Sequence, residues 1–532
     1  MMTRRQVMQA TAAGAGVLLG DRILMGAGSV AAQPKGGNLS IAIYSDPVMN
    51  PVIAQGKESN WTNAFLFNML VKPSEENPAR MVPDLARSWD ISSDGTVWTF
   101  HLRTNVKWHD GKPFTAEDVK FTFDRILDST TNTRLRSDLR PIQSIDVVNA
   151  GTVRFRLGKP YAPLLTFLGY TAGIVPKHLL DGKDINTAAE FNTKKPIGTG
   201  AFRLRSYRSA SEVVVEANPD YHLGRPHLDT VTLKIVPDVN AQIALLNTGG
   251  LDLAMIEPFA LGGVKGNPNL DIVTFDQMTW WHISPNTTVP LFADKRVRQA
   301  LTHALDREAI SKNVSGGSWP VMATPIPPFL KPWHNPAVQP YAYNPEKAAS
   351  LLREVGWTKG SDGMLQKDGQ PLKFKLLWGR IAGRQEIAVL VQQYWRDLGV
   401  DVEMEGLEWS ATIARFVKRD YQIFLDRWVA PYEPDMTNYF SSSAATTGKN
   451  SAVYRNPEID RMLEAGRSAT DLEERKKIYF KFQEAIHDEQ PQIFLFWQPD
   501  TQVRSKAFSG IPRMATGLGD PFYYANEYRR LQ

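Results

Sequence analysis

Residues 83–119 read PDLARSWDISSDGTVWTFHLRTNVKWHDGKPFTAEDV, and this stretch carries several local structural signals. The Asp94-Gly95 pair is typical of a two-residue hairpin turn, and the β-branched and aromatic residues after it predict a strand over 97–102. The pattern Thr115-Ala-Glu-Asp118 resembles a capping box, in which a hydroxyl residue and an acid three positions later satisfy free N–H groups at a helix start. It predicts a helix over 116–127.

The same two kinds of pattern recur along the rest of the chain. Capped helical patterns begin at Asn344-Pro345, with Gly356 as the stop, and at Asp471, from which a helix is predicted to run to about residue 487. Asp368-Gly369 predicts a second hairpin. Further strands are predicted over residues 38–44, 152–157, 213–217, 230–236, 372–378 and 421–426. Because strands and helices mix over the whole length, we predict an α/β architecture.

Composition excludes several classes of protein. The chain has 532 residues and contains no cysteine, so disulfides, a thiol nucleophile, Cys-ligated zinc and covalently attached haem are excluded. The length predicts about two to four domains or lobes. The net charge of +5 is small for this length, and charges of both signs are interleaved, so we expect no nucleic-acid partner.

Residues 1–32 have the pattern of an export signal. Arg4 and Arg5 precede an apolar run rich in Ala and Gly, and small residues end at Ala32. The adjacent arginines resemble a twin-arginine signal, although Val7-Met8 stands where that motif prefers Phe-Leu. No run reaches the ~18–20 apolar residues that span a bilayer. We therefore predict cleavage after Ala32; a short amphipathic helix is the alternative.

The common catalytic and cofactor motifs are missing. The chain has no Gly-x-Ser-x-Gly, no P-loop and no His-Glu-x-x-His, and its 9 histidines are scattered. His222 and His227 are the closest pair; surface positions are the usual interpretation of such turn residues, and a metal site is the alternative. Catalytic triads can assemble from distant positions, but these absences lower the expectation for an enzyme. We expect no catalytic residues and no cofactor.

Aromatic residues recur instead in polar, turn-rich surroundings. Such faces, with a few charged groups, suit an enclosed cleft for a small ligand, and ordinary core packing is the alternative for each of them. The residues concerned are Trp280, Trp281, His282, Trp378, Arg380, Trp409, Trp428 and Tyr432.

Longer motifs give the chain a family resemblance. Besides the stretch 83–119, they are Pro196-Ile-Gly-Thr-Gly200, Asn218-Pro-Asp-Tyr221, Asp294-Lys-Arg-Val-Arg-Gln-Ala300, Ala304-Leu-Asp-Arg307, Asn344-Pro-Glu-Lys-Ala348 and Asn456-Pro-Glu-Ile-Asp460. In these motifs the chain resembles the large bacterial solute-binding proteins of ABC transporters for peptides, opines, nickel chelates and oligosaccharides (extracellular solute-binding family 5). The resemblance covers about residues 38–500.

The resemblance implies a two-lobed periplasmic binding protein fold of type II, in a large variant with an extra subdomain on lobe I. By analogy, lobe I combines residues near 38–68, 198–283 and 498–532. The extra subdomain covers about 69–197, and lobe II about 284–497. The matching motifs are expected to shape the fold rather than to touch ligand. Asp306, for example, is expected to orient backbone or arginine groups.

The resemblance also indicates ligand residues. In peptide-binding relatives, a segment like residues 427–435 supplies a Trp and an Asp to the cleft, and the Asp pairs with the peptide's α-ammonium. Trp428 matches the Trp, with Tyr432 nearby. Pro431, which cannot pair with an ammonium, stands at the Asp position, so Glu433 or Asp435 is expected to substitute. This departure leaves an opine, a sugar-containing compound or a modified peptide open.

Two further expectations concern the other side of the cleft. Arg380 and Arg384 follow the strand that ends at Trp378, and we predict that one of them binds a ligand carboxylate or phosphate, since Arg can donate two parallel hydrogen bonds. Trp281 precedes the first crossover between the lobes and is expected to stack on the ligand.

The implied function is capture by closure. Ligand stabilises a closed arrangement of the lobes, which docks on the membrane permease of an ABC importer. A peptide or peptide-like ligand is favoured; an opine, an oligosaccharide or a metal chelate or haem near His282 is the alternative, and a secreted hydrolase is the alternative of another class. Relatives in single-membrane bacteria are typically tethered through a lipidated cysteine. Without one, we predict a free monomer in a Gram-negative periplasm.

Overall fold

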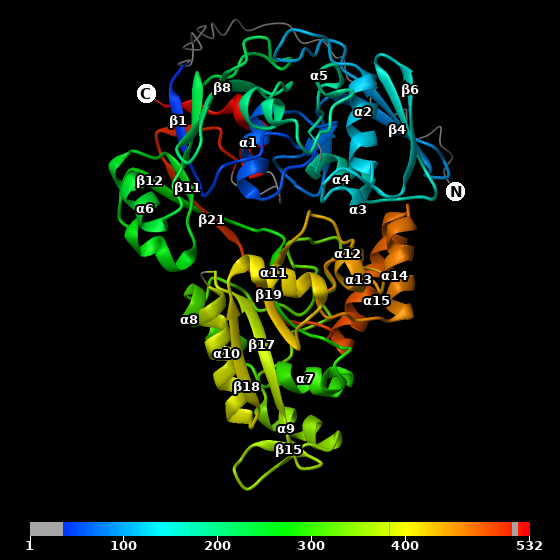
Figure 1. Cartoon of the computed structure of the whole chain (residues 1–532), viewed down its shortest axis with the longest axis vertical. Coiled ribbons are helices and arrows are strands. Elements are labelled where there is room, and N and C mark those ends of the chain that lie inside the picture. The colour runs from blue at the N-terminus through cyan, green and yellow to red at the C-terminus, as the bar shows by residue number, and fades with distance from the viewer. Residues whose placement is uncertain (1–35, 172, 382, 513–519, 532) are drawn as a thin grey trace, which may run out of the picture. The chain divides into compact units, whose positions relative to one another are not determined.

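Two β-sheets dominate the protein, and the chain passes twice between them (Figure 1). The computed structural model describes residues 36–171, 173–381, 383–512 and 520–531, so the predicted export signal lies outside the described residues. The seven-stranded sheet consists, in order, of β12 (Leu270–Phe275), β21 (Asp500–Ser505), β11 (Leu253–Met255), β1 (Asn38–Ile43), β10 (Thr230–Ile235), β9 (Glu212–Ala217) and β8 (Phe202–Arg208). Among those residues, no helix has the length and apolarity that a membrane crossing would require.

The five-stranded sheet consists, in order, of β18 (Asp401–Leu407), β17 (Lys373–Gly379), β19 (Ile423–Val429), β13 (Thr279–Pro285) and β20 (Ile493–Trp497). The chain enters it between β12 and β13 and leaves it between β20 and β21. The two crossings lie side by side, since the backbone N–H of Gln498 donates to the carbonyl of Thr279 over 2.9 Å. Two adjacent connecting segments therefore join the seven-stranded and five-stranded sheets.

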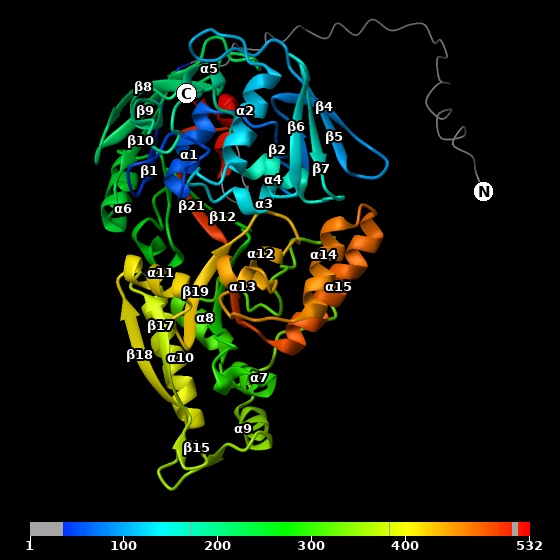
Figure 2. The same ribbon diagram turned by 45° about the vertical axis from the view of Figure 1, so that its right-hand side comes forward.

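A separate antiparallel sheet of four strands is inserted between β3 (Met81–Pro83) and β8. Its order is β4 (Ala86–Ile91), β5 (Val97–Leu102), β7 (Thr152–Leu157) and β6 (Ile142–Asn149). Helix α2 (Ala116–Leu127) packs against β6 and β7 (Figure 2). Residues 83–119 thus build the first hairpin of this sheet and the start of its covering helix.

The remaining elements complete the layers around the sheets. Helix α10 lies along β17 and β18, and α14 and α15 lie side by side (Figures 1 and 2). The helices besides α2 are α1 (Lys57–Leu66), α3 (Arg136–Leu139), α4 (Leu164–Thr171), α5 (Lys177–Leu180), α6 (Val239–Thr248), α7 (Lys295–His303), α8 (Arg307–Ser315), α9 (Pro345–Glu354), α10 (Arg384–Leu398), α11 (Trp409–Lys418), α12 (Thr437–Phe440), α13 (Ala444–Thr447), α14 (Pro457–Ser468) and α15 (Leu472–Glu489). The short strands are β2 (Val71–Pro73), β14 (Thr358–Lys359), β15 (Leu365–Lys367), β16 (Gln370–Pro371), β22 (Phe508–Ser509) and β23 (Arg529–Arg530).

Local signals placed most elements correctly. The strand over 97–102 and the helix over 116–127 have the predicted bounds, and the Asp118 carboxylate accepts from the backbone N–H of Thr115 over 2.9 Å. Asn344 and Asp471 cap α9 and α15 as predicted, and α15 runs two residues beyond 487. The strand predicted over 421–426 is shifted to 423–429. The Asp368-Gly369 turn joins β15 to β16 rather than preceding β17 directly.

Adjacent tryptophans on β13 serve two different cores. Trp280 belongs to the largest hydrophobic cluster, with Leu39, Phe65 and Phe100, whereas Trp281 belongs to a second cluster around the five-stranded sheet. Successive side chains of a strand point to opposite faces, which separates the two rings. Their exposures are 0% and 1%, so the aromatic pair is built into the core on both faces.

The Pro196-Ile-Gly-Thr-Gly200 motif allows a close approach between backbones. A Cβ atom on Gly198 would lie 1.8 Å from the carbonyl oxygen of Leu66, and one on Gly200 would lie 2.3 Å from that of Phe65. No side chain fits at either position. The motif therefore fixes the end of α1 against the start of β8.

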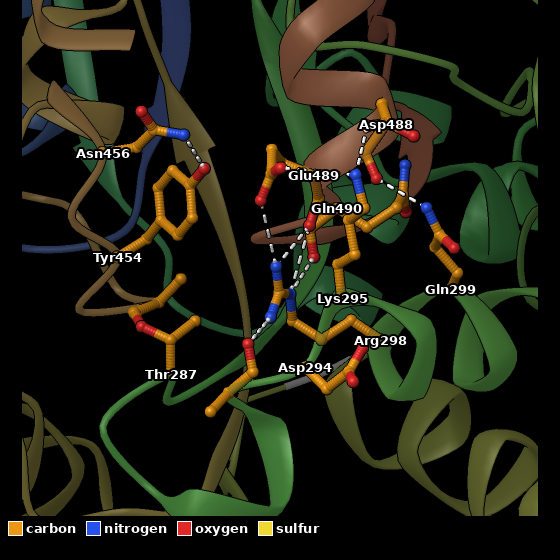
Figure 3. Close-up of polar contacts among 12 residues, drawn as sticks. Thr287, Asp294, Lys295, Arg298, Gln299, Tyr454, Asn456, Asp488, Glu489 and Gln490 are labelled. Atoms are coloured by element: carbon orange, nitrogen blue, oxygen red, sulfur yellow. Dashed lines mark hydrogen bonds and ion pairs between the residues drawn. The ribbon is translucent and has the colours of Figure 1, made fainter. Parts of the chain in front are cut away.

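The motif around Asp294 is also structural, as was predicted (Figure 3). Arg298 on α7 is 2% exposed, and its guanidinium donates to the carbonyls of Glu489 (2.6 Å), Gln490 (3.1 Å), Phe292 (2.8 Å) and Ala293 (2.9 Å). Two of these carbonyls, of Glu489 and Gln490, lie at the C-terminal end of α15, where helix carbonyls lack partners within the helix. Arg298 thus ties α7 to the end of α15.

Asp306 also has a structural role, at the start of α8. Its carboxylate accepts from the backbone N–H of Ala309 over 2.9 Å and so caps α8. Arg307, the next residue, is buried and donates to the carbonyls of Met322 (3.2 Å) and Phe494 (2.5 Å). The expected role of Asp306 in orienting backbone groups is confirmed.

Candidate functional site

Two adjoining cavities lie at the end of β19, with volumes of about 320 and 290 Å³. They share Arg134 and Val429, and we call them together the Arg134 cleft. The first is lined by Arg134, Leu135, Ser137, Asp138, Phe167, Phe416, Val429, Pro431, Asp435, Asn438, Tyr439, Gly448 and Lys449. The second is lined by Gly56, Lys57, Asn60, Arg134, Glu257, Gln277, Thr279, Arg427, Val429 and Asp500.

The walls of the Arg134 cleft come from distant parts of the chain. Arg134 lies just before α3, Asp138 lies in α3, which leads into β6 of the four-stranded sheet, and Lys57 begins α1. Val429 ends β19 of the five-stranded sheet, and Lys449 follows α13. A pocket with apolar and charged walls that converge from several elements is the usual form of a small-molecule site.

Several charges in the Arg134 cleft are already paired. Lys57 Nζ lies 2.7 Å from the Asp500 carboxylate. Arg427 lies 3.6 Å from the Glu257 carboxylate and donates to the Gln498 side chain over 2.8 Å. These pairs hold the crossing segments and β19 in place.

Three charged groups in the Arg134 cleft have uncharged partners. Lys449 Nζ donates to the Tyr439 hydroxyl over 3.3 Å. Arg134 donates to the Ala54 carbonyl (3.3 Å) and the Asn60 side chain (3.1 Å). Asp138 accepts from the Asn438 amide.

Arg134, Asp138 and Lys449 are partly desolvated by the surrounding protein but still line an open cavity. The side chains of Arg134 and Lys449 are exposed to the interior of the cleft. Desolvation by the surrounding protein nevertheless lowers the pKa of Lys449, although Asp138 raises it in part. Desolvation likewise raises the pKa of Asp138, against the opposing effect of Lys449. Each group would gain from an oppositely charged partner in the cleft.

Comparison with known proteins identifies the family. Residues 80–451 match the family model described as "Bacterial extracellular solute-binding proteins, family 5 Middle". The chain belongs to this family. It is 32% identical over 474 residues to the "Oligopeptide-binding protein AppA" of Bacillus subtilis, a match that covers 87% of this chain and 86% of that protein.

Solved structures agree with this assignment. The structure of AppA from Bacillus subtilis in complex with a nonapeptide aligns with a TM-score of 0.81 and 30% identity, over 94% of this chain and 100% of that one. The structure of NikZ from Campylobacter jejuni in complex with Ni(L-His) aligns with a TM-score of 0.82 and 30% identity, over 93% and 99%. The predicted family and two-lobed α/β fold are confirmed.

Among the residues predicted for this family 5 chain, Asp435 lines the Arg134 cleft. Its carboxylate is engaged, however, because Arg467 lies 3.0 Å away and Thr437 donates to it through both its N–H (3.0 Å) and its hydroxyl (2.5 Å). Pro431 lines the same cavity. The cleft therefore contains Pro431, the position at which the family resemblance implies an Asp in peptide-binding relatives.

Trp428 lies behind the wall of the cleft. Its ring centre is 5.7 Å from that of Phe416 and 5.8 Å from Lys449 Nζ, and both of these residues line the cavity. On its other side it stacks on His282 at 5.7 Å. Trp428 is thus placed to position Lys449.

Tyr432 and Glu433 point away from the Arg134 cleft. Tyr432 donates to the Asp276 carbonyl and lines a third cavity of about 1100 Å³, together with Phe329 and Trp497. Glu433 is buried and forms an ion pair with Arg475. Tyr432 and Glu433, the two residues after Pro431, are therefore engaged elsewhere.

The predicted arginines and Trp281 do not line the Arg134 cleft. Arg384 is buried, and its guanidinium pairs with Asp426 at 2.5 Å and lies 5.7 Å from the Trp281 ring. The Trp281 indole donates to Gln498 over 2.8 Å. Arg380 is exposed and donates to the Gly406 carbonyl over 2.9 Å. Trp281 and Arg384 are thus brought together, but in the core.

His282 lies in the core and does not line the Arg134 cleft. His282 is 0% exposed, and burial lowers its pKa to about 3. It faces Ser284 at 3.0 Å rather than a cavity. Within the described ranges, no group of three or more His, Cys, Asp or Glu side chains is arranged to hold a metal ion, so His222 and His227 form no such site.

Sequence reasoning missed Arg134, Asp138 and Lys449. None of them belongs to a motif, and they lie in or beside turns and one-turn helices. A turn residue with a charged side chain is usually a solvated surface residue. Only the folded arrangement brings these three to one cavity.

Proposed function

We propose that the chain is the receptor of an ABC importer and that it binds a peptide or peptide-like solute in the Arg134 cleft. The observation that carries the proposal is this cleft, whose charged groups converge from distant parts of a family 5 chain. The ends of a peptide are an ammonium and a carboxylate, and Asp138 on one side and Arg134 and Lys449 on the other match them in kind. The protein itself carries out no covalent chemistry in this proposal.

Asp138 takes over the role of the missing family Asp in this proposal. Pro431 cannot pair with an ammonium, but Asp138 lines the same cavity, and the side chains that donate to it, the Asn438 amide and the Ser137 hydroxyl (3.4 Å), are uncharged. The α-ammonium of the ligand then pairs with Asp138. Glu433 and Asp435 keep Arg475 and Arg467 as partners.

Closure of the lobes is the proposed mode of capture. The two adjacent crossings between the seven-stranded and five-stranded sheets would act as the hinge, and ligand bound between their walls would stabilise the closed arrangement. The proposed lobes keep the limits given above: residues near 38–68, 198–283 and 498–532, and residues 284–497, with 69–197 as the extra subdomain. A monomer that docks on a permease completes the proposal.

The proposed place of action is the periplasm, with residues 1–32 as a twin-arginine-like signal. Relatives of this family are extracellular or periplasmic binding proteins, which supports an extracytoplasmic location. Cell fractionation of the full-length chain, with and without Arg4→Lys and Arg5→Lys together, tests it. Export that persists unchanged in the double variant would contradict the twin-arginine route.

A thermal-denaturation screen tests the peptide proposal. Dipeptides, tripeptides, longer peptides, opines and oligosaccharides are each added in excess to the purified mature chain. A true ligand at 100 times its Kd is expected to add about 2.7 kcal/mol of stability, which raises the unfolding midpoint. Stabilisation by oligosaccharides alone would overturn the peptide proposal and keep the receptor.

Asp138→Asn is expected to weaken the binding of peptides that have a free N-terminus by about tenfold or more, because it removes one charge-assisted hydrogen bond of the α-ammonium. Isothermal titration with one such peptide and its N-acetylated form measures this. The acetylated peptide is the control, since it has no ammonium to lose. If both forms lose affinity equally in the variant, Asp138 does not bind the ammonium.

A further inference from the structure

The charges that line the Arg134 cleft do not balance. Lys57 and Asp500 pair at 2.7 Å, and Arg427 pairs with Glu257 at 3.6 Å. Asp435, which also lines the cleft, pairs with Arg467 at 3.0 Å. Each of these carboxylates has a cation, so the three ion pairs are neutral, although Arg467 itself lies outside the lining.

Two cations and one carboxylate are left. Arg134 and Lys449 form no ion pair with a carboxylate in the part of the chain that the structure describes, and neither does Asp138 with a cation. The lining residues themselves carry four cations and four carboxylates, and an excess of one positive charge arises because Arg467, outside the lining, neutralises Asp435.

Protein surrounds the excess charge, so it influences binding strongly. A ligand that fills a cavity of about 320 Å³ displaces the water that solvates Lys449. A cation that loses water without gaining an anion is costly, whereas a carboxylate placed against it forms a charge-assisted hydrogen bond. The same holds for Arg134, whose planar fork suits a carboxylate.

From this count we infer that the ligand is anionic, with one more carboxylate or equivalent acidic group than it has ammonium groups. This inference rests on the proposed function, since it takes the Arg134 cleft as the ligand site. The ammonium of such a ligand faces Asp138, and its two acidic groups face Arg134 and Lys449. Two chemical classes fit: short peptides with one acidic side chain, and amino acids whose nitrogen carries a carboxyalkyl group.

A neutral zwitterion fits the cleft less well. One ammonium and one carboxylate pair with Asp138 and one of the cations, and the other cation is left without a partner. A ligand with a net positive charge fits least, because its second cation meets Arg134 or Lys449. Electrostatic complementarity of this kind sets selectivity more than total affinity.

The test compares three tripeptides of equal length by isothermal titration: Ala-Glu-Ala, Ala-Gln-Ala and Ala-Lys-Ala. We expect Ala-Glu-Ala to bind about ten- to a hundredfold more tightly than Ala-Gln-Ala, as one charge-assisted hydrogen bond predicts. Lys449→Met is expected to bring this ratio close to one. Lys477→Met, a change of the same kind on the exposed face of α15, is the control and is expected to keep the ratio.

The outcomes separate the inference from the proposed function. If Ala-Gln-Ala binds as tightly as Ala-Glu-Ala, or if Lys449→Met keeps the ratio, the inference is overturned and the peptide receptor stands. If N-(1-carboxyethyl) amino acids bind and no tripeptide does, the inference stands and the peptide proposal is overturned. If no compound of the panel binds, both are overturned. The thermal unfolding midpoint of Lys449→Met checks its fold.

Discussion

Arg298→Met is expected to lower the free energy of unfolding by about 3–5 kcal/mol, because it removes a buried charge that serves several buried groups. The guanidinium donates to the carbonyls of Phe292, Ala293, Glu489 and Gln490. The methionine side chain fills much of the space but donates nothing, so these carbonyls lose their partners. Chemical denaturation monitored by circular dichroism measures the change through the denaturation midpoint.

Arg296→Met on the same helix is the matched control for this prediction. Arg296 pairs with Asp294 at 2.7 Å, but the two side chains are 43% and 39% exposed. Exposed pairs contribute little, so a change within about 0.5 kcal/mol is expected. If Arg298→Met lowered the free energy of unfolding as little as Arg296→Met, the hydrogen bonds of Arg298 would not be what secures the end of α15 against α7.

Much of the fold could be predicted because its signals are local. The Asp94-Gly95 turn, the Thr115 cap and the Asn344-Pro345 helix start depend on residues within a few positions of one another. Their geometry follows from backbone sterics and from helix-end hydrogen bonding. The exceptions lie where tertiary packing decides, as in the shift of the strand predicted at 421 to 423–429.

The site was harder to predict because it depends on pairings across the chain. Arg384 and Glu433 were sound candidates by residue type, but each has a buried partner 42 residues away, Asp426 and Arg475. A charge that is satisfied inside the protein is unavailable to a ligand. No local pattern distinguishes such a residue from Lys449, whose charge has no carboxylate partner in the described residues.

Glu433→Gln is expected to lower the free energy of unfolding by about 3–5 kcal/mol, since it leaves the buried guanidinium of Arg475 without a countercharge. Both residues are largely shielded from water, with exposures of 5% and 7%. Arg475 also donates to the Gly466 carbonyl over 2.8 Å, which holds the guanidinium at this place. Glutamine has nearly the same shape as glutamate, so the loss reports the charge rather than a cavity.

The second substitution Arg475→Met, made together with Glu433→Gln, separates two roles for Glu433. If the carboxylate serves Arg475, removing both charges recovers much of the lost stability, because the uncompensated charge is gone. The affinity for a peptide ligand then changes less than about twofold in Glu433→Gln, as no charge in the Arg134 cleft is altered. If affinity instead falls about tenfold while stability is unchanged, Glu433 contacts the ligand and the ion pair with Arg475 gives way in the bound state. The unfolding curve and the titration therefore have to be measured on the same variants, since only the two together tell a ligand residue from a core residue at this position.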